Sequence, residues 1–210
     1  MFDLLKKNDI MPNGSLDDHC RNYLPHIERK LCQMITFRLY DSVPSAVVRQ
    51  WKEQLNSSRE GKDVTTEERN RRLLTLIDNY EDAGYGSCLL RDEGAAEIVR
   101  DSLYYYNEKK YRLLAWCLMP NHVHVLILQL SDTPLSDILH GWRSYTSRRI
   151  NKLMHRTGKV WMTEYFDRFI RDPKHFNTAV KYIHNNPVKA GLCSSPSQYR
   201  WSSAYQVDDV

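Results

Sequence analysis

Hydrophobic residues recur along the chain at two different spacings. Short runs of β-branched and aromatic residues, in part alternating with polar ones, are typical of strands. Strands are therefore predicted at 32–40, 111–118 and 123–130. Repeats at three to four residues predict helices. Helices are expected at about 44–57, 66–80, 92–107, 135–154 and 173–185.

Two details of this pattern limit the elements. Val160 and Trp161 are expected to form only a short extended piece. The last helix should end before Pro187, because the residue before a proline disfavours helical geometry.

The order of the elements predicts an α+β fold with a small antiparallel sheet and helices packed on one face. Residues 1–28 are polar and carry a turn signal at Pro12-Asn13-Gly14, so they are predicted to form an N-terminal extension. We expect a single domain over 29–205, with 57–90 as a helical insertion or connection and 206–210 as a tail. A chain of 210 residues is long enough for one well-buried domain and need not form two.

Composition is that of an ordinary globular protein, with 41% hydrophobic and 27% charged residues. No stretch approaches the roughly 18 consecutive apolar residues that cross a bilayer, and the first residues lack the apolar run of a secretory signal. Five cysteines occur without a CxxC pair, which argues against a disulfide framework or a cysteine-type zinc site. We therefore predict a cytoplasmic protein without a membrane partner.

Positive charge is concentrated in residues 141–190, which hold eleven Lys or Arg against three acids, a balance of +8. The whole chain carries only +4, so the remainder is mildly acidic. A basic block of this kind suits a polyanion such as nucleic acid, although a solvated helix face is the alternative. Seven of its cations are predicted phosphate contacts: Arg143, Arg148, Arg149, Arg168, Arg171, Lys181 and Lys189. Four nearby aromatic residues could stack on unpaired bases or pack in the core: Trp142, Trp161, Tyr165 and Phe166.

The candidate chemistry begins in residues 119–128, Met-Pro-Asn-His-Val-His-Val-Leu-Ile-Leu. Side chains at i and i+2 of a strand share one face. His122 and His124 are therefore expected to point one way, while Val123 and Val125 point into a core. Two neutral imidazoles make half of a divalent metal site, but such a pair taken alone is more often structural.

The last predicted helix offers further groups. Tyr182 and Asn186 are four residues apart and share one helical face. If that face meets the histidine strand, Asn186 could give a metal ion a neutral oxygen, and Tyr182 would present its phenol to the bound substrate. A phenol is a poor nucleophile unless positive charge favours the phenolate, and a metal ion with Lys or Arg of the basic block would supply it. Tyr145 on the basic helix is a rival nucleophile.

These residues resemble the HUH single-strand DNA endonucleases, and within them the REP-associated tyrosine transposases. The resemblance rests on His122-Val-His124 and on Tyr182 in Tyr-Ile-His-Asn-Asn-Pro-Val. Flanking motifs of the same kind extend over roughly residues 22–205. They are Leu24-Pro-His26, Ile35–Leu39 leading into Asp41–Pro44, Met119-Pro-Asn121, Gly158–Trp161, Phe166-Asp-Arg168 and Trp201–Ser203.

The resemblance implies a ferredoxin-like fold, with His122, His124 and Asn186 as ligands of Mg²⁺ or Mn²⁺ and Tyr182 as the nucleophile. It implies a nick in single-stranded DNA that leaves a 5′-phosphotyrosine and a free 3′-OH, so that the strand can be rejoined. The expected substrates are hairpins of repetitive extragenic palindromes, bound by a monomer or a homodimer.

Two other functions stay open. A ferredoxin-like sheet can also bind single-stranded nucleic acid without catalysis, in which case no covalent adduct forms. A metal-dependent phosphodiesterase that activates water would turn over repeatedly and would survive Tyr182→Phe.

Overall fold

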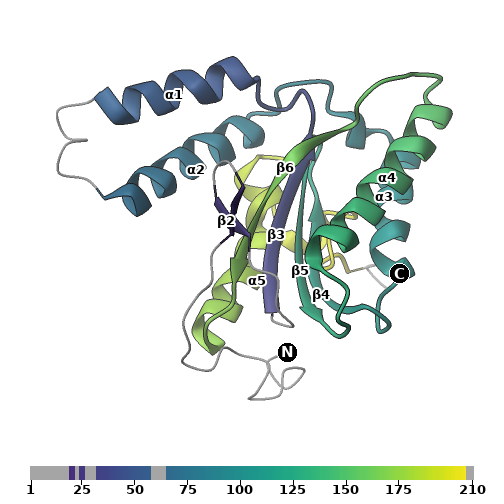
Figure 1. Ribbon diagram of the computed structural model, residues 1–210. Helices are drawn as coiled ribbons and strands as arrows, with labels where there is room; N and C mark the ends of the chain where they lie inside the picture. Colours follow the sequence, from purple (N-terminus) through teal and green to yellow (C-terminus); the bar gives the residue numbers. More distant parts are fainter. Residues whose placement is uncertain (1–18, 22–23, 27–31, 58–64, 207–210) are drawn as a thin grey trace.

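The structure is a computed structural model that describes residues 19–21, 24–26, 32–57 and 65–206. Its centre is an antiparallel sheet of four strands in the order β4-β5-β3-β6 (Figure 1). The strands are β3 (Cys32–Leu39), β4 (Tyr111–Leu118), β5 (His122–Gln129) and β6 (Trp161–Phe169). A separate pair, β1 (His19–Arg21) and β2 (Leu24–His26), forms a two-stranded sheet.

The helices follow the predicted spacing closely. They are α1 (Ser45–Ser57), α2 (Thr66–Asp82), α3 (Glu93–Tyr105), α4 (Leu135–Leu153) and α5 (Pro173–Lys189). Short 3-10 helices, η4 (Leu89–Arg91) and η5 (Pro196–Gln198), complete the described elements. Side-chain caps define several of the helix starts. The side chains of Thr65, Asp92 and Asp172 accept backbone N–H groups of the first turns of α2, α3 and α5.

The chain order β3-α3-β4-β5-α4-β6 has the connectivity of a ferredoxin-like fold. Each β-α-β unit joins strands that are not neighbours, because β5 separates β3 from β4, and β3 separates β5 from β6. The predicted α+β class and its antiparallel sheet are confirmed.

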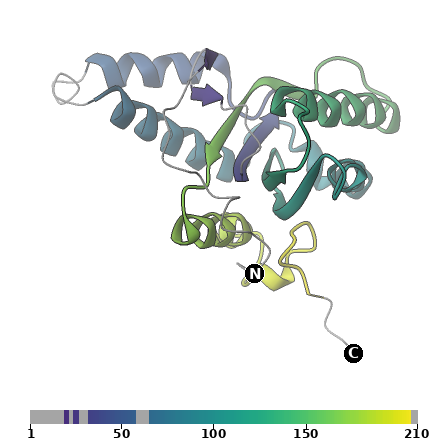
Figure 2. The same cartoon turned by 60° about the horizontal axis from the view of Figure 1, so that its bottom comes forward.

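The two faces of the sheet carry different helices (Figure 2). On one face, α3 and α4 pack over Val123, Val125 and Ile127 of β5, together with Trp142 of α4 and Trp161 of β6. On the other face, α5 packs through Phe176, Ala179 and Ile183 onto Leu126 and Leu128. The sequence analysis placed helices on one face; α3 and α4 do lie there, whereas α5 covers the opposite face because its apolar stripe matches the other parity of β5.

The α1–α2 hairpin lies between β3 and α3 in the chain and beyond the β6 edge of the sheet in space (Figure 1). A small core of Val43, Leu73 and Ile77 joins the two helices, and Phe166 of β6 packs against it. This hairpin includes part of the predicted insertion at 57–90, of which residues 58–64 lie outside the described residues.

Two boundary predictions were wrong. The predicted short piece at 160–161 is the start of the nine-residue strand β6, whose mixed polar composition hides its period. The last helix continues through Pro187 to Lys189. Pro187 lies in the final turn and is buried, and the N–H of Leu192 bonds to its carbonyl, so the missing N–H of the proline does not end the helix.

The ends of the predicted domain scheme lie largely outside the described residues. Within the predicted extension at 1–28 only β1 and β2 are described, and within the tail at 206–210 only residue 206 is described. None of the described helices has the length and apolar character needed to span a bilayer. Cys88, Cys117 and Cys193 are free thiols.

Candidate catalytic site

Two imidazoles lie side by side on β5, on the face that carries α5. His122 and His124 are each 1% exposed. Their Nε2 atoms are 3.0 Å apart, and the ring centroids are 4.7 Å apart. Val123 and Val125 belong to the core on the opposite face. Because side chains alternate along the strand, both rings lie on the same face of the sheet and next to each other.

The residue before this pair fixes the tautomer of His122. The Asn121 amide Nδ2 donates to the backbone carbonyls of Glu81 and Tyr85, at 3.0 Å each. Its Oδ1 consequently faces Nδ1 of His122, at 2.8 Å. Because an amide oxygen only accepts, Nδ1 carries the hydrogen and Nε2 keeps its lone pair.

His124 is held from the neighbouring strand. Its Nδ1 lies 2.8 Å from the hydroxyl of Thr36, which is its cross-strand partner on β3. Burial lowers the pKa of His122 well below its usual value, and it lowers the pKa of His124 to about 3. Both rings are therefore neutral at pH 7, which is the state that binds a metal ion.

The helix α5 brings a phenol and an amide to these rings. Asn186 Nδ2 lies 3.1 Å from Nε2 of His124. Its Oδ1 is buried without a hydrogen-bond partner. One turn earlier, the Tyr182 ring meets the His124 ring edge-on, with centroids 5.2 Å apart. The phenol, the amide and the imidazoles thus form one cluster.

The Tyr182 hydroxyl points toward α2. It donates a hydrogen bond to Asp78 Oδ2 at 3.2 Å. Burial raises the pKa of Tyr182, and the charges of Asp78, Asp82 and Glu81 raise it further. The phenol is therefore protonated at neutral pH in this arrangement. The sequence analysis expected Lys or Arg to act on the phenol, whereas the charged groups that act on it are acidic.

A buried carboxyl and a guanidinium lie close together behind the histidines. Glu81 is 2% exposed and continues the buried face of α2 that includes Leu73 and Ile77. Its Oε1 lies 3.6 Å from Nη1 of Arg38, the cross-strand partner of His122. Burial raises the pKa of Glu81 to about 8, against the opposing effect of Arg38. Neither carboxyl oxygen has a hydrogen-bond partner.

The donor set fits a divalent ion with open positions. Among the described residues, no cluster of three or more His, Cys, Asp and Glu side chains is arranged to hold a metal ion. The cluster itself offers an amide, that of Asn186, as a third protein ligand beside His122 and His124. Asn186 suits this role because its buried oxygen lacks a partner, and rotation of the amide exchanges its oxygen and nitrogen.

Four of the predicted phosphate contacts lie around α5 and β6. Lys189 pairs with Asp82 at 2.7 Å, and its charge reaches both histidines. Arg168 is exposed and acts on Asp78. Arg171 and Lys181 are exposed, just before α5 and on it. Of these cations, Lys181 and Lys189 are on α5, which contributes Tyr182 and Asn186 to the cluster.

The other three lie on α4, across the sheet from the histidines. Arg148 and Arg149 are exposed. The Arg143 guanidinium donates to two backbone carbonyls of β6 and lies over the Tyr165 ring. Tyr145, the rival nucleophile, is also on α4 and is 45% exposed. The structure therefore does not bring these four residues to the cluster.

Sequence reasoning missed the contribution of α2. Asp78 and Glu81 come from the hairpin outside the ferredoxin-like order, so nothing local ties them to Tyr182. One signal was present: Glu81 follows Leu73 and Ile77 at four-residue steps, which places a carboxylate on the apolar side of an amphipathic helix.

Comparison with known proteins places this core in context. Residues 89–186 match the family model described as "Transposase IS200 like". A REP-associated tyrosine transposase of Escherichia coli (strain K12) is 26% identical over 141 residues, which are 66% of this chain and 72% of that protein. This chain is therefore similar to the REP-associated tyrosine transposases. The resemblance inferred from the sequence is thereby confirmed.

Two further similarities are more partial. A candidate member of the same group from Haemophilus influenzae is 24% identical over 106 residues, covering 46% of this chain and 60% of that protein. A solved structure of a REP-associated tyrosine transposase bound to a REP hairpin gives a TM-score of 0.49 at 14% identity, covering 90% of this chain and 82% of that chain.

Proposed function

We propose that this protein nicks and rejoins single-stranded DNA at REP-like hairpins through a 5′-phosphotyrosine on Tyr182. The observation that carries the proposal is the packing of the Tyr182 ring 5.2 Å from His124, while Asn186 of the next turn reaches the same imidazole. The names of the similar proteins support REP elements as the substrate class. A cytoplasmic location and a monomeric or homodimeric state stay predictions.

In the proposed reaction, Tyr182 Oη attacks the phosphorus of the scissile phosphodiester, and the bond from phosphorus to O3′ breaks. The phenol proton passes to Asp78, which already accepts its hydrogen bond, and the leaving O3′ takes a proton from water. The reverse attack by a 3′-OH rejoins the strand. A divalent ion held by His122, His124 and Asn186 would stabilise the charge that develops on the phosphate oxygens.

The surroundings of Tyr182 explain why such an ion is needed. Burial and three carboxylates raise the pKa of its phenol, so attack requires a compensating positive charge. Lys189 pairs with Asp82, and the charge of Arg168 acts on Asp78, so both cations lie near the cluster and suit the flanking phosphates. The neutral imidazoles leave the full charge of an ion available to the substrate.

The test is covalent capture of DNA. Purified protein is mixed with a REP-like hairpin oligonucleotide and Mn²⁺, and the products are separated on a denaturing gel. The wild type should form a protein–DNA adduct that disappears with a chelator and in Tyr182→Phe. The matched control is Tyr145→Phe, which removes the same hydroxyl on α4 and should still form the adduct.

The gel also separates the alternatives. The protonated state of the phenol favours a nucleic-acid-binding module without catalysis as the second candidate. Hairpin binding by the wild type without any adduct would support that module. Repeated turnover that survives in Tyr182→Phe would instead support a phosphodiesterase that activates water.

A further inference from the structure

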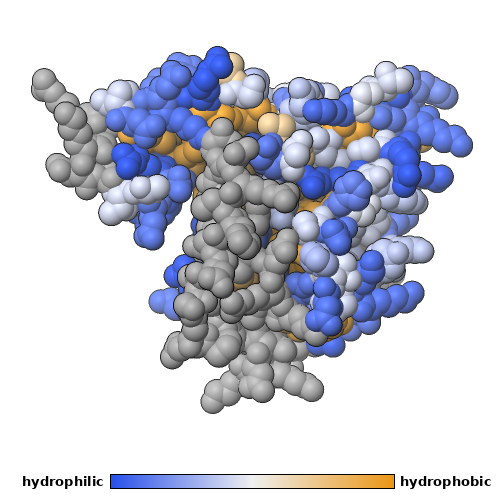
Figure 3. Space-filling view, viewed as in Figure 1, coloured by the Kyte–Doolittle hydropathy of each residue, from blue (hydrophilic) through white to orange (hydrophobic). Residues whose placement is uncertain are grey.

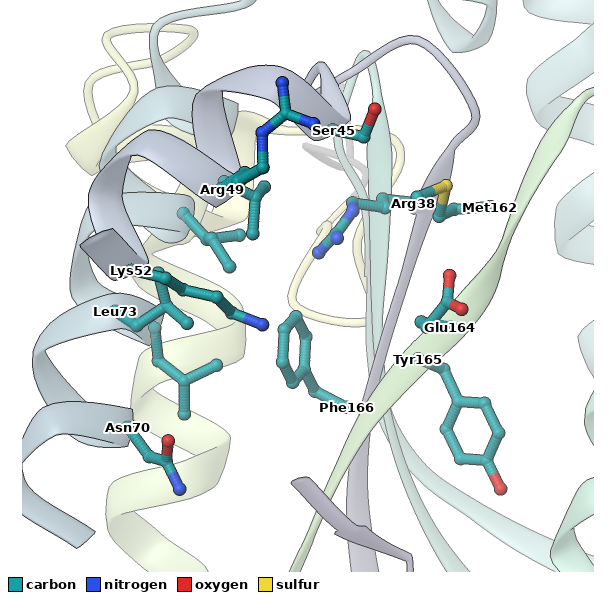
Figure 4. Close-up of a pocket in the computed structure, with 13 residues that line it drawn as sticks. Arg38, Ser45, Arg49, Lys52, Asn70, Leu73, Met162, Glu164, Tyr165 and Phe166 are labelled. Carbon is teal, nitrogen blue, oxygen red and sulfur yellow. The ribbon is translucent and has the colours of Figure 1, made fainter. Parts of the chain in front are cut away.

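A cavity of about 300 Å³ lies between the α1–α2 hairpin and the sheet (Figure 4). Its walls come from α1, α2, β3 and β6, so it is formed by the insertion and not by the ferredoxin-like elements alone. Arg38 and Lys52 extend from opposite walls toward the Phe166 ring (Figure 4). Hydrophobic surface is visible in the region of α1 and α2 in Figure 3. The volume of the cavity is at the lower end of the range for small-ligand sites.

One residue in the wall of this cavity has a hydrogen-bond donor without an acceptor. Arg38 is 6% exposed, and its Nε has no hydrogen-bond partner. The guanidinium lies 3.6 Å from Glu81 and 5.3 Å from the Phe166 centroid, but neither contact satisfies this donor. A buried donor without an acceptor costs free energy. Its position in the wall therefore indicates a ligand that brings an acceptor.

The cavity adjoins the candidate catalytic site. Arg38 is the cross-strand partner of His122, and Thr36, two residues earlier, holds His124. Phe166 pairs with Thr36 from the other side of β3. A DNA strand with one phosphate at the histidines therefore has a neighbouring nucleotide within reach of the cavity.

The lining has the chemistry of a nucleotide site. Arg49 and Lys52 of α1 add two cations that suit phosphates, and Phe166 offers an aromatic ring on which a base can stack. Asn70 and Glu164 add polar groups that can meet the edge of a base. Apolar walls from Leu73 and its neighbours exclude a wholly charged ligand.

We propose that this cavity binds one unstacked nucleotide of the single-stranded DNA substrate, with its base against Phe166 and its phosphates near Arg49 and Lys52. The inference rests on the proposed function and assigns to the α1–α2 hairpin a role in gripping the DNA beside the scissile phosphate.

The test compares two probes in a chelator, so that cleavage plays no part. One probe is a fluorescent thymidine 12-mer, and the other is an abasic backbone of equal length and charge. Fluorescence anisotropy should show that the wild type prefers the thymidine probe by about 10-fold or more. Phe166→Leu, which keeps an apolar side chain but removes the ring, should lose most of this preference, whereas Phe166→Tyr should keep it.

The cations are tested with the same probes. Arg49→Ala and Lys52→Ala should weaken both probes equally and should each lower the salt slope of log affinity by about 0.7. The matched control is Lys109→Ala, an exposed lysine between α3 and β4, outside the residues that line the cavity; it should leave binding unchanged.

The outcomes separate the two proposals. An unchanged preference for thymidine in Phe166→Leu, or Arg49 and Lys52 variants that behave like Lys109→Ala, would overturn the nucleotide cavity alone. A wild type that binds both probes equally would also overturn the nucleotide cavity alone. A wild type that binds neither probe would also overturn the nucleotide cavity, whereas the proposed function is contradicted only by the absence of the covalent adduct with the hairpin oligonucleotide.

Discussion

Glu81 allows a prediction whose size follows from the structure. Its carboxyl is buried beside Arg38, and burial raises its pKa from 4.5 to about 8. An acid with a raised pKa in the folded protein stabilises the fold at low pH, and this stability is lost as the pH rises toward the folded value. The loss should occur between pH 4.5 and about pH 8, at about 1.4 kcal/mol per pH unit.

The perturbation is Glu81→Gln, which resembles the neutral carboxyl and cannot ionise. From about pH 5.5 to 7.5, the unfolding free energy of the wild type should fall relative to that of the variant by roughly 2–3 kcal/mol. The buried histidines of the site also titrate on unfolding, but they do so in both proteins and cancel in the difference.

Urea denaturation in a chelator, followed by circular dichroism at several pH values, measures this difference. The control is Glu97→Gln, an exposed residue of α3, whose curve should run parallel to that of the wild type. If the Glu81→Gln curve also ran parallel to the wild type, the carboxyl would not be held neutral by burial, and the reasoning about this pair would be refuted.

Three other predictions concern single side chains. Asn186→Ala should weaken Mn²⁺ binding about 10-fold or more in calorimetry, and an unchanged affinity would remove Asn186 from the ligand set. Asn121→Ala should lower the unfolding free energy by about 2 kcal/mol and also weaken Mn²⁺ binding, because it frees His122 Nδ1 and two backbone carbonyls. Thr146→Val should cost about 1–3 kcal/mol in urea denaturation, because the buried Trp161 indole N–H donates to this hydroxyl; no loss would mean that the indole finds another acceptor.

Local pattern was sufficient for most elements. The strand at 111–118 has the observed bounds of β4, and the predicted helices agree with α1 to α4 to within a few residues. These segments each carry an apolar side that packs against other elements, so their periods are visible in the sequence. The strand β6 is an edge strand with one neighbour, and its inner and outer positions are both partly exposed. Its alternation was too weak to recognise.

In the candidate site, too, some residues follow from local sequence patterns and others do not. The shared face of His122 and His124 follows from the period of a strand, and the spacing of Tyr182 and Asn186 follows from the period of a helix. Asp78 reaches Tyr182 across 104 positions of sequence, through the packing of α2 beside α5. No local rule relates them, so only the three-dimensional arrangement reveals the carboxylate.

The parity of β5 has a consequence for how this protein can change. Odd positions such as Val123 fill the interior, and even positions such as His124 carry the chemistry. Deleting one residue from the Pro120–Asn121 turn and shifting the strand by one position would place the imidazoles in the core under α3 and α4 and turn the valines toward α5. Viable length changes on this strand should therefore come in pairs of residues.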